Sequence, residues 1–273
     1  LSPIILLMPY ALAGLGAIWQ DLPAASNALG LASLVLGAVF LGMFAWNRAG
    51  RASGLMAALF LSLSPGLVVT LGSESCTVVM LILGGMLAYS RARYTWAAIL
   101  LALAALVRPD AVLAFVAVGI CHLARREPIP WRAVWLWAGM VGISYAALWL
   151  YFGSPLPVTL QAKQQQGEMA VSQRFGPALV SLVQNRIREP LYWLSTVLGL
   201  AGLGRVLTRH RVWIPLLVWT ALYVAAYSLL GVSRYFWYFA PLAPAFAVLV
   251  AEGAEALLSR AAARLPERMI QGM

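Results

Sequence analysis

The sequence predicts an all-α fold, a polytopic transmembrane helical bundle that occupies residues 1–273 as a single domain. Of the 273 residues, 62% are hydrophobic and only 10% are charged, and the mean hydropathy is +0.84. This composition excludes a water-soluble enzyme and a disordered chain, and two cysteines are too few for a disulfide scaffold. Because one helical span needs roughly 20 residues, about ten spans leave no room for a separate soluble domain.

The spans are located by apolar windows that end at charged or turn residues. In chain order the windows cover residues 3–19, 28–46, 53–71, 75–90, 94–107, 111–123, 131–152, 191–207, 212–231 and 235–251. The fifth and sixth windows are too short for a hydrocarbon core of about 30 Å. We therefore expect a hairpin of two short helices shielded by neighbours, with the Arg108-Pro109-Asp110 turn near the external interface.

The single long connection covers residues 153–190 and includes an amphipathic segment. Apolar side chains share one face of a helix there, while polar side chains occupy another face, as in a helix that lies in the membrane interface. The apolar set is Leu179, Leu182, Val183 and Ile187, and the polar set is Gln184, Arg186 and Arg188. We expect this helix on the external side.

The net charge of +10 comes from arginines scattered between the apolar windows. Arginines follow the second and fourth windows and flank the sixth-to-seventh and eighth-to-ninth turns, which predicts that these turns and the tail 252–273 are cytoplasmic. The scattered pattern indicates contact with a lipid bilayer and no nucleic-acid partner.

Arginines also occur on the predicted external side, against the usual trend. Arg108 and Arg234 are candidates to bind the phosphate of a ligand, because guanidinium groups bind phosphate in a bidentate manner, and Lys163 can assist them. The alternative for Arg108 is a structural pair with Asp110 or Glu74 that closes the helix hairpin.

Glu74 and Asp110 are the acidic candidates, and each has two interpretations. Both precede an apolar helix, where a carboxylate is stabilised by the helix dipole, and both can instead orient an arginine or a sugar. The histidines and cysteines are too dispersed to predict a metal site or a disulfide. The absence of a Walker or dinucleotide motif disfavours ATP-driven or NAD-dependent chemistry.

Five sequence strings, taken together, carry a family resemblance. They are SPIILLMPYAL at residues 2–12, LSLSPGLVVTLGSES at 61–75, ALAALVRPDAVL at 102–113, YFGSPLPVTLQAK at 151–163 and VSRYFWYFAPLAP at 232–244. Their order and spacing over nearly the whole chain resemble the bacterial integral-membrane glycosyltransferases of the GT-C superfamily, near the protein-mannosyltransferase-like and arabinofuranosyltransferase-like branches.

The resemblance implies a multi-pass protein of the bacterial cytoplasmic membrane. It also implies transfer of a sugar from a polyprenyl-phosphate donor to a glycan, lipid or protein acceptor at the external face. Donor phosphate is then bound by Arg108, Arg234 and Lys163, with Glu74 and Asp110 toward the sugar or the arginines. The lipid-linked sugar is a substrate, so no cofactor is expected, and a requirement for divalent metal is left open.

The sequence departs from the family pattern where the catalytic acid is expected. GT-C enzymes usually carry this acid in the first external loop, and we expect this chain to begin after that loop, with the base upstream of it. Asp21 is the remaining early acid, and Val158 stands where related sequences often have a polar residue. Two alternatives stay open: a secondary transporter or lipid-linked-sugar flippase, and a non-catalytic membrane subunit.

Overall fold

The computed structural model describes residues 14, 21–46, 49–153, 164–169 and 172–262. Within these residues the fold is all-helical, and its β-structure is limited to one isolated antiparallel bridge between Arg174 and Ser233. The labelled elements are α2 (Leu22–Trp46), α3 (Arg51–Ser62), α4 (Pro65–Val68), α5 (Ser75–Ser90), α6 (Tyr94–Val107), η1 (Pro109–Ala111), α7 (Val112–Ala124), α8 (Trp131–Phe152), α10 (Phe175–Arg186), α11 (Pro190–Thr208), η2 (Arg211–Trp213), α12 (Ile214–Leu230), η3 (Phe236–Tyr238), η4 (Ala240–Leu242) and α13 (Ala243–Ala262).

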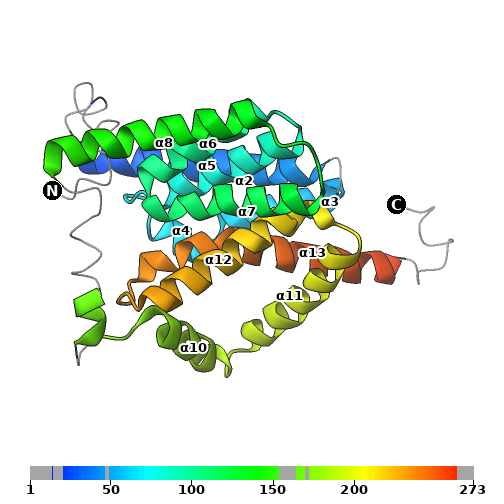
Figure 1. Cartoon of the computed structure of the whole chain (residues 1–273). Helices are drawn as coiled ribbons and strands as arrows, with labels where there is room; N and C mark the ends of the chain where they lie inside the picture. The colour runs from blue at the N-terminus through cyan, green and yellow to red at the C-terminus, as the bar shows by residue number, and fades with distance from the viewer. Residues whose placement is uncertain (1–13, 15–20, 47–48, 154–163, 170–171, 263–273) are drawn as a thin grey trace.

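The helices pack in a connected series. α8 packs on α6, α6 on α5, α5 on α2, α2 on α3, α3 on α13, and α13 on α11. α7 and α12 pack against each other (Figure 1). α10 and α11 form an arm along one side of the bundle, which Figure 1 shows below α12 and α13.

The predicted helical bundle is present, but the described residues do not support ten spans. Five helices are long and apolar enough to cross a membrane, and they cover Leu22–Trp46, Trp131–Tyr151, Pro190–Thr208, Arg211–Leu230 and Phe236–Arg260. The windows at 75–90, 94–107 and 111–123 form helices of only 16, 14 and 13 residues. The window at 3–19 lies outside the described residues.

The window at 53–71 is divided by a proline. α3 ends at Ser62, and Pro65 begins the short helix α4, because a proline lacks the amide hydrogen that would continue the earlier helix. The apolar composition of this window therefore does not produce one continuous span.

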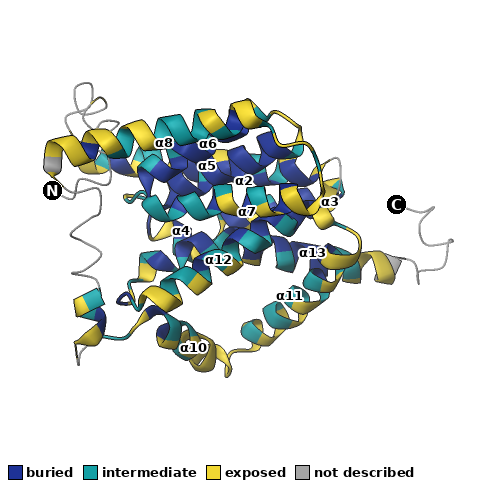
Figure 2. Cartoon of the chain, in the orientation of Figure 1, coloured by how far each residue is buried: buried dark blue, intermediate teal, exposed yellow. Residues whose placement is uncertain are grey.

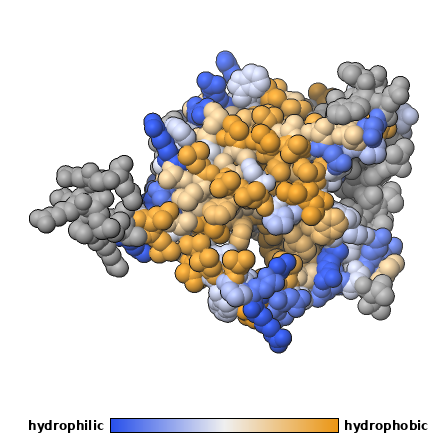
Figure 3. Space-filling model, turned by 180° about the vertical axis from the view of Figure 1, so that it is seen from behind, coloured by the Kyte–Doolittle hydropathy of each residue, from blue (hydrophilic) through white to orange (hydrophobic). Residues whose placement is uncertain are grey.

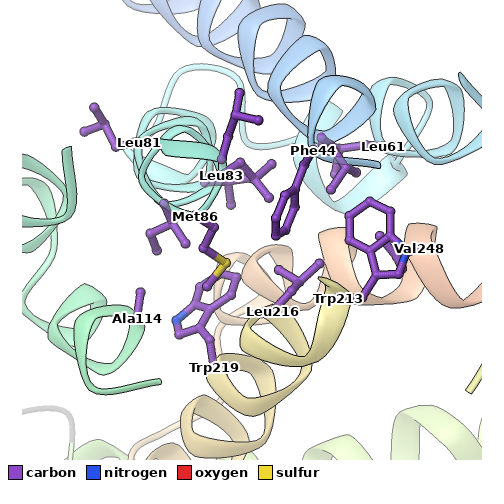
Figure 4. Close-up of a cluster of buried hydrophobic side chains, with 14 of the residues drawn as sticks. Phe44, Leu61, Leu81, Leu83, Met86, Ala114, Trp213, Leu216, Trp219 and Val248 are labelled. Carbon is purple, nitrogen blue, oxygen red and sulfur yellow. The ribbon is translucent and has the colours of Figure 1, made fainter. Parts of the chain in front are cut away.

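The core lies where α5 meets α2, α6 and α12. Nearly every side chain of α5 is buried, including Leu83 and Met86 (Figure 2). Figure 4 shows Met86 beside Trp219 and Phe44 beside Trp213, and the rings of Phe44 and Trp213 meet edge to face at 5.1 Å between centroids. The short helices α5 and α6 are thus enclosed by longer ones.

α11 and α13 approach each other closely at two glycines. A Cβ atom at Gly202 would lie 1.9 Å from the carbonyl oxygen of Leu249, and one at Gly253 would lie 1.9 Å from that of Leu198. Only glycine permits this backbone contact, as in closely packed membrane helices. The contact anchors α11, which is otherwise largely exposed.

The outer surface is strongly apolar. Figure 3 shows a broad hydrophobic face, with hydrophilic residues gathered toward its margins. Only 11% of the apolar window in each of α8 and α11 is buried. Exposed side chains such as Leu150, Trp135 and Leu191 are compatible with contact to lipid.

The segments predicted outside the spans also have helical structure. Within the long connection, α10 buries Phe175 and Ala178 and leaves Leu182 and Val183 exposed, so its apolar face is shared between the bundle and the surroundings. The predicted tail from residue 252 begins instead as a continuation of α13, with Glu252 fully buried. The last described helical residue is Ala262.

Candidate functional site

Arg108 lies at the turn between α6 and α7, where the chain cannot remain helical. A residue before proline is restricted to extended backbone, and Arg108 has φ −143° and ψ 126° before Pro109. The turn places the guanidinium inside the bundle, where the residue is only 5% exposed.

Asp110 binds the guanidinium of Arg108 in a bidentate manner. Arg108 Nε donates to Asp110 Oδ1 at 3.1 Å, and Nη2 donates to Oδ2 at 2.7 Å. Burial by itself would lower the pKa of Arg108, but the Asp110 carboxylate together with the Tyr223 and Tyr227 hydroxyls outweighs this effect and holds the pKa above its ordinary value. The guanidinium therefore remains charged.

Tyrosines of α12 complete this ion pair. The Tyr227 hydroxyl donates to Asp110 Oδ2 at 2.8 Å and accepts from Arg108 Nη2 at 3.0 Å. Tyr223 accepts a long hydrogen bond of 3.5 Å from Nη2 and donates to the Tyr238 carbonyl at 3.0 Å. The Tyr238 ring lies 5.9 Å from the guanidinium carbon. α12 and the segment before α13 thus hold the α6–α7 turn.

One nitrogen of the Arg108 guanidinium is left without a hydrogen bond in the described part of the chain. Nη1 is buried and has no hydrogen-bond partner among the described residues. The nearest carboxylate is that of Glu74, whose Oε1 lies 3.9 Å away, within ion-pair distance but beyond hydrogen-bond distance. A buried guanidinium N–H without a partner is unusual, and it can donate a hydrogen bond to an anion or a water.

Glu74 occupies the N-cap position of α5 but does not cap the helix with its side chain. That carboxylate is partly exposed, at 24%, and accepts no hydrogen bond from the described residues. Asp110, by contrast, has both oxygens engaged. The structure therefore brings Glu74, Arg108 and Asp110 together. The Asp110 carboxylate is fully hydrogen-bonded, whereas the Glu74 carboxylate can still accept a hydrogen bond.

Arg234 lies at the same end of the bundle but is not part of the ion pair. Its side chain is exposed, and Nη1 donates to Gln173 Oε1 at 3.1 Å. The backbone amide of Arg234 donates to the Gln173 carbonyl at 2.7 Å, and the nearby Tyr235 hydroxyl donates to Gln166 at 2.7 Å. The segment before α10 therefore positions Arg234.

Asp21, another predicted site residue, is separate from this cluster. Asp21 is exposed, and its Oδ1 accepts a hydrogen bond of 3.1 Å from the Ala24 amide, so it caps α2. Lys163 lies outside the described residues. Among the described residues there is no group of three or more His, Cys, Asp or Glu that could hold a metal ion.

A small cavity adjoins Asp110 on its inner side. Its volume is about 10 Å³, enough for about one water, and it is lined by Asp110, Ala111, Tyr223 and apolar neighbours. A sugar phosphate does not fit there.

A second buried polar cluster, at the opposite end of the bundle, was not predicted. Glu252 of α13 is fully buried and accepts hydrogen bonds from Ser53 Oγ and Trp213 Nε1, each at 2.7 Å. His210 Nδ1 lies 2.8 Å from the other Glu252 oxygen, and Arg205 Nε lies 3.1 Å from it. The available signal was a carboxylate directly after the apolar window 235–251, because a charged residue so close to hydrocarbon is costly.

The tyrosines around Arg108 were also missed. Tyr223 and Tyr227 are four residues apart on an apolar helix, so that spacing places both hydroxyls on one face. The spacing is visible in the sequence, but their partner lies more than 100 residues away. Sequence spacing alone does not reveal such a partner.

Comparison with known proteins adds no identification. No family model, no curated protein and no solved structure matches the chain. The resemblance to the GT-C superfamily therefore rests on the sequence strings quoted above.

Proposed function

We propose that this chain is a membrane glycosyltransferase that uses a polyprenyl-phosphate sugar and transfers the sugar to an acceptor at the external membrane face. The observation that carries the proposal is the buried, charged guanidinium of Arg108, whose Nη1 lacks a hydrogen-bond partner among the described residues. The donor phosphate is the anion that completes it, because arginine binds phosphate well in a partly desolvated site.

The cationic residues have separate roles in this proposal. Arg108 contacts the phosphate through Nη1, while Asp110 and Tyr227 hold the rest of the guanidinium in place. Arg234 is exposed at the same end and guides the phosphate from the lipid side. Lys163 has the same predicted role.

Among the described carboxylates, Glu74 is the best placed to act as the base, a role that the family resemblance assigns to an upstream residue. The acceptor hydroxyl attacks the anomeric carbon, the bond from that carbon to the phosphate oxygen breaks, and the phosphate leaves with the bonding electrons. The hydroxyl proton passes to Glu74, which lies beside Arg108 and accepts no hydrogen bond from the described residues. Arg108 stabilises the charge that develops on the phosphate.

A secondary transporter or lipid-linked-sugar flippase is the second candidate function. The buried Glu252, with His210 and Arg205 beside it, favours this candidate, because ionisable groups inside membrane bundles often mark transport pathways. This cluster lies at the opposite end from Arg108, so the two candidates make different residues essential.

The proposal is tested with the full chain in lipid nanodiscs. Binding of undecaprenyl phosphate is compared with that of undecaprenol, and transfer is assayed from polyprenyl-phosphate mannose and arabinose. We expect Glu74→Gln to lower transfer by roughly 100-fold or more while phosphate binding persists. We expect Arg108→Lys to weaken phosphate binding, and Arg188→Gln, an exposed arginine of the α10–α11 connection, to change neither.

Equal binding of undecaprenyl phosphate and undecaprenol would contradict the phosphate site. Passage of a lipid-linked sugar across the bilayer without transfer, abolished by Glu252→Gln and unaffected by Glu74→Gln, would establish the second candidate instead. Phosphate binding without transfer or passage would indicate a non-catalytic subunit.

A further inference from the structure

The connection between α5 and α6 carries two arginines on an unusual turn. Ala92, between Arg91 and Arg93, has a positive φ of 55°, a conformation that favours glycine. The turn is closed by hydrogen bonds from the Ala92 amide to the Tyr89 carbonyl and from the Arg93 amide to the Ala88 carbonyl, both 2.9 Å. The tight turn brings both arginines to one place.

Both arginines line a cavity that is otherwise apolar. Its volume is about 170 Å³, and it lies where α2, the end of α5 and the start of α6 meet. The remaining lining residues are Phe40, Gly84, Leu87, Ala88, Trp96 and Leu100. A Cβ atom at Gly84 would lie 3.0 Å from the Phe40 ring, so the glycine keeps the floor of the cavity open.

The two guanidinium groups lack an anionic partner within the described part of the chain. Neither forms an ion pair there, whereas Arg174, Arg186 and Arg205 each pair with a glutamate. No Asp or Glu lines the cavity. Two adjacent cations therefore lie at the edge of an apolar hollow without compensating charge.

We propose that this cavity binds an anionic phospholipid. The headgroup phosphate lies between Arg91 and Arg93, and the first part of one hydrocarbon chain lies against Phe40, Leu87 and Leu100. Trp96, 59% exposed, lies at the depth of the headgroups, where tryptophan is favoured at membrane interfaces. The site is independent of the proposed transferase site, which lies at the opposite end of the bundle.

The two arginines and the apolar lining together determine the class of ligand that this cavity binds. A free phosphate or a nucleotide would leave the apolar floor in water, while a neutral lipid would leave both arginines unpaired. An anionic phospholipid satisfies both parts, since cytoplasmic-leaflet anionic headgroups attract arginines and hydrocarbon chains occupy apolar cavities.

Native mass spectrometry of the detergent-purified full chain tests the site. The protein is titrated with dioleoyl phosphatidylglycerol, with dioleoyl phosphatidylcholine, which has the same chains, and with glycerol phosphate, which has no chains. We expect preferential binding of phosphatidylglycerol. Arg91→Gln combined with Arg93→Gln should weaken it on the order of tenfold, and Arg91→Lys combined with Arg93→Lys should largely preserve it.

The matched control is Arg209→Gln combined with Arg211→Gln. These arginines have the same spacing of two residues and are also exposed, but they do not line the cavity. An equal loss in this control would show diffuse attraction and overturn the proposal. Equal binding of glycerol phosphate and phosphatidylglycerol, or unchanged binding in the Arg91 and Arg93 double variant, would also overturn it.

Discussion

At the scale of the residue, the ion pair of Arg108 and Asp110 stabilises the fold and still leaves one nitrogen of Arg108 to bind a ligand. Arg108 and Asp110, on either side of Pro109, form a bidentate ion pair inside the bundle. Tyrosine hydroxyls of α12 hydrogen-bond to this pair, whereas Nη1 of Arg108 has no hydrogen-bond partner among the described residues. The structural interpretation of Arg108 and the phosphate-binding interpretation therefore apply to different nitrogen atoms of the same side chain.

The ion pair predicts a large difference between two aspartate substitutions. Asp110→Asn leaves the buried guanidinium without its counter-ion and should lower the free energy of unfolding by about 3–5 kcal/mol. Asp21→Asn should have almost no effect, because asparagine caps a helix about as well as aspartate. Thermal unfolding in the same detergent measures both, and equal effects would contradict the role of the pair.

At the scale of the element, burial compensates for the shortness of α5, α6 and α7. A helix exposed to lipid has to cross the hydrocarbon, whereas a helix enclosed by protein does not. α5 is almost entirely buried, and the turn after α6 can therefore hold a charged pair among tyrosines. The candidate site exists because the turn between α6 and α7 lies inside the bundle.

The contact between α11 and α13 predicts a position-specific effect of glycine substitutions. Gly202→Ala places a methyl group against the Leu249 carbonyl, so we expect α11 to separate from α13 and stability to fall by several kcal/mol. Gly199→Ala, on the same helix with nothing within 4 Å of the added carbon, should be neutral or stabilising by up to about 1 kcal/mol.

Thermal unfolding of the two glycine variants is the first measurement. The second is limited proteolysis near Arg209, which reports release of α11. Comparable stability of the two variants would contradict the close contact of these helices.

At the scale of the whole molecule, charged residues form separate groups at the two ends of the bundle. Glu74, Arg108 and Arg234 gather at one end, and the unpaired arginines of the α5–α6 turn lie at the other. The excess of arginine at the second end predicts that it faces the cytoplasm.

This orientation predicts different labelling of two exposed positions. In a background with Cys76→Ala and Cys121→Ala, Arg234→Cys should react with a membrane-impermeant maleimide in intact cells. Arg209→Cys should react only after permeabilisation. Labelling of both from outside, or of Arg209→Cys alone, would contradict the predicted orientation.

By itself, the sequence determined the features that depend on local chemistry. Its apolar composition determined a helical membrane-type bundle, and Pro109 determined the break that ends α6 at Val107. The spacing of charges also placed Glu74, Arg108 and Asp110 near the same end. The first two conclusions require only neighbouring residues, and the third requires only the alternation of helices along the chain.

Only the tertiary structure decided the number of long helices and the partners of the buried charged residues. The partners of Arg108 on α12 are 115 and 119 residues away, and Glu252 meets Ser53 across 199 residues. Such contacts depend on how the helices pack against one another. An apolar window has the same sequence pattern whether lipid or protein surrounds the helix. The unpaired Nη1 of Arg108 and the burial of Glu252 are therefore evident only in the folded chain.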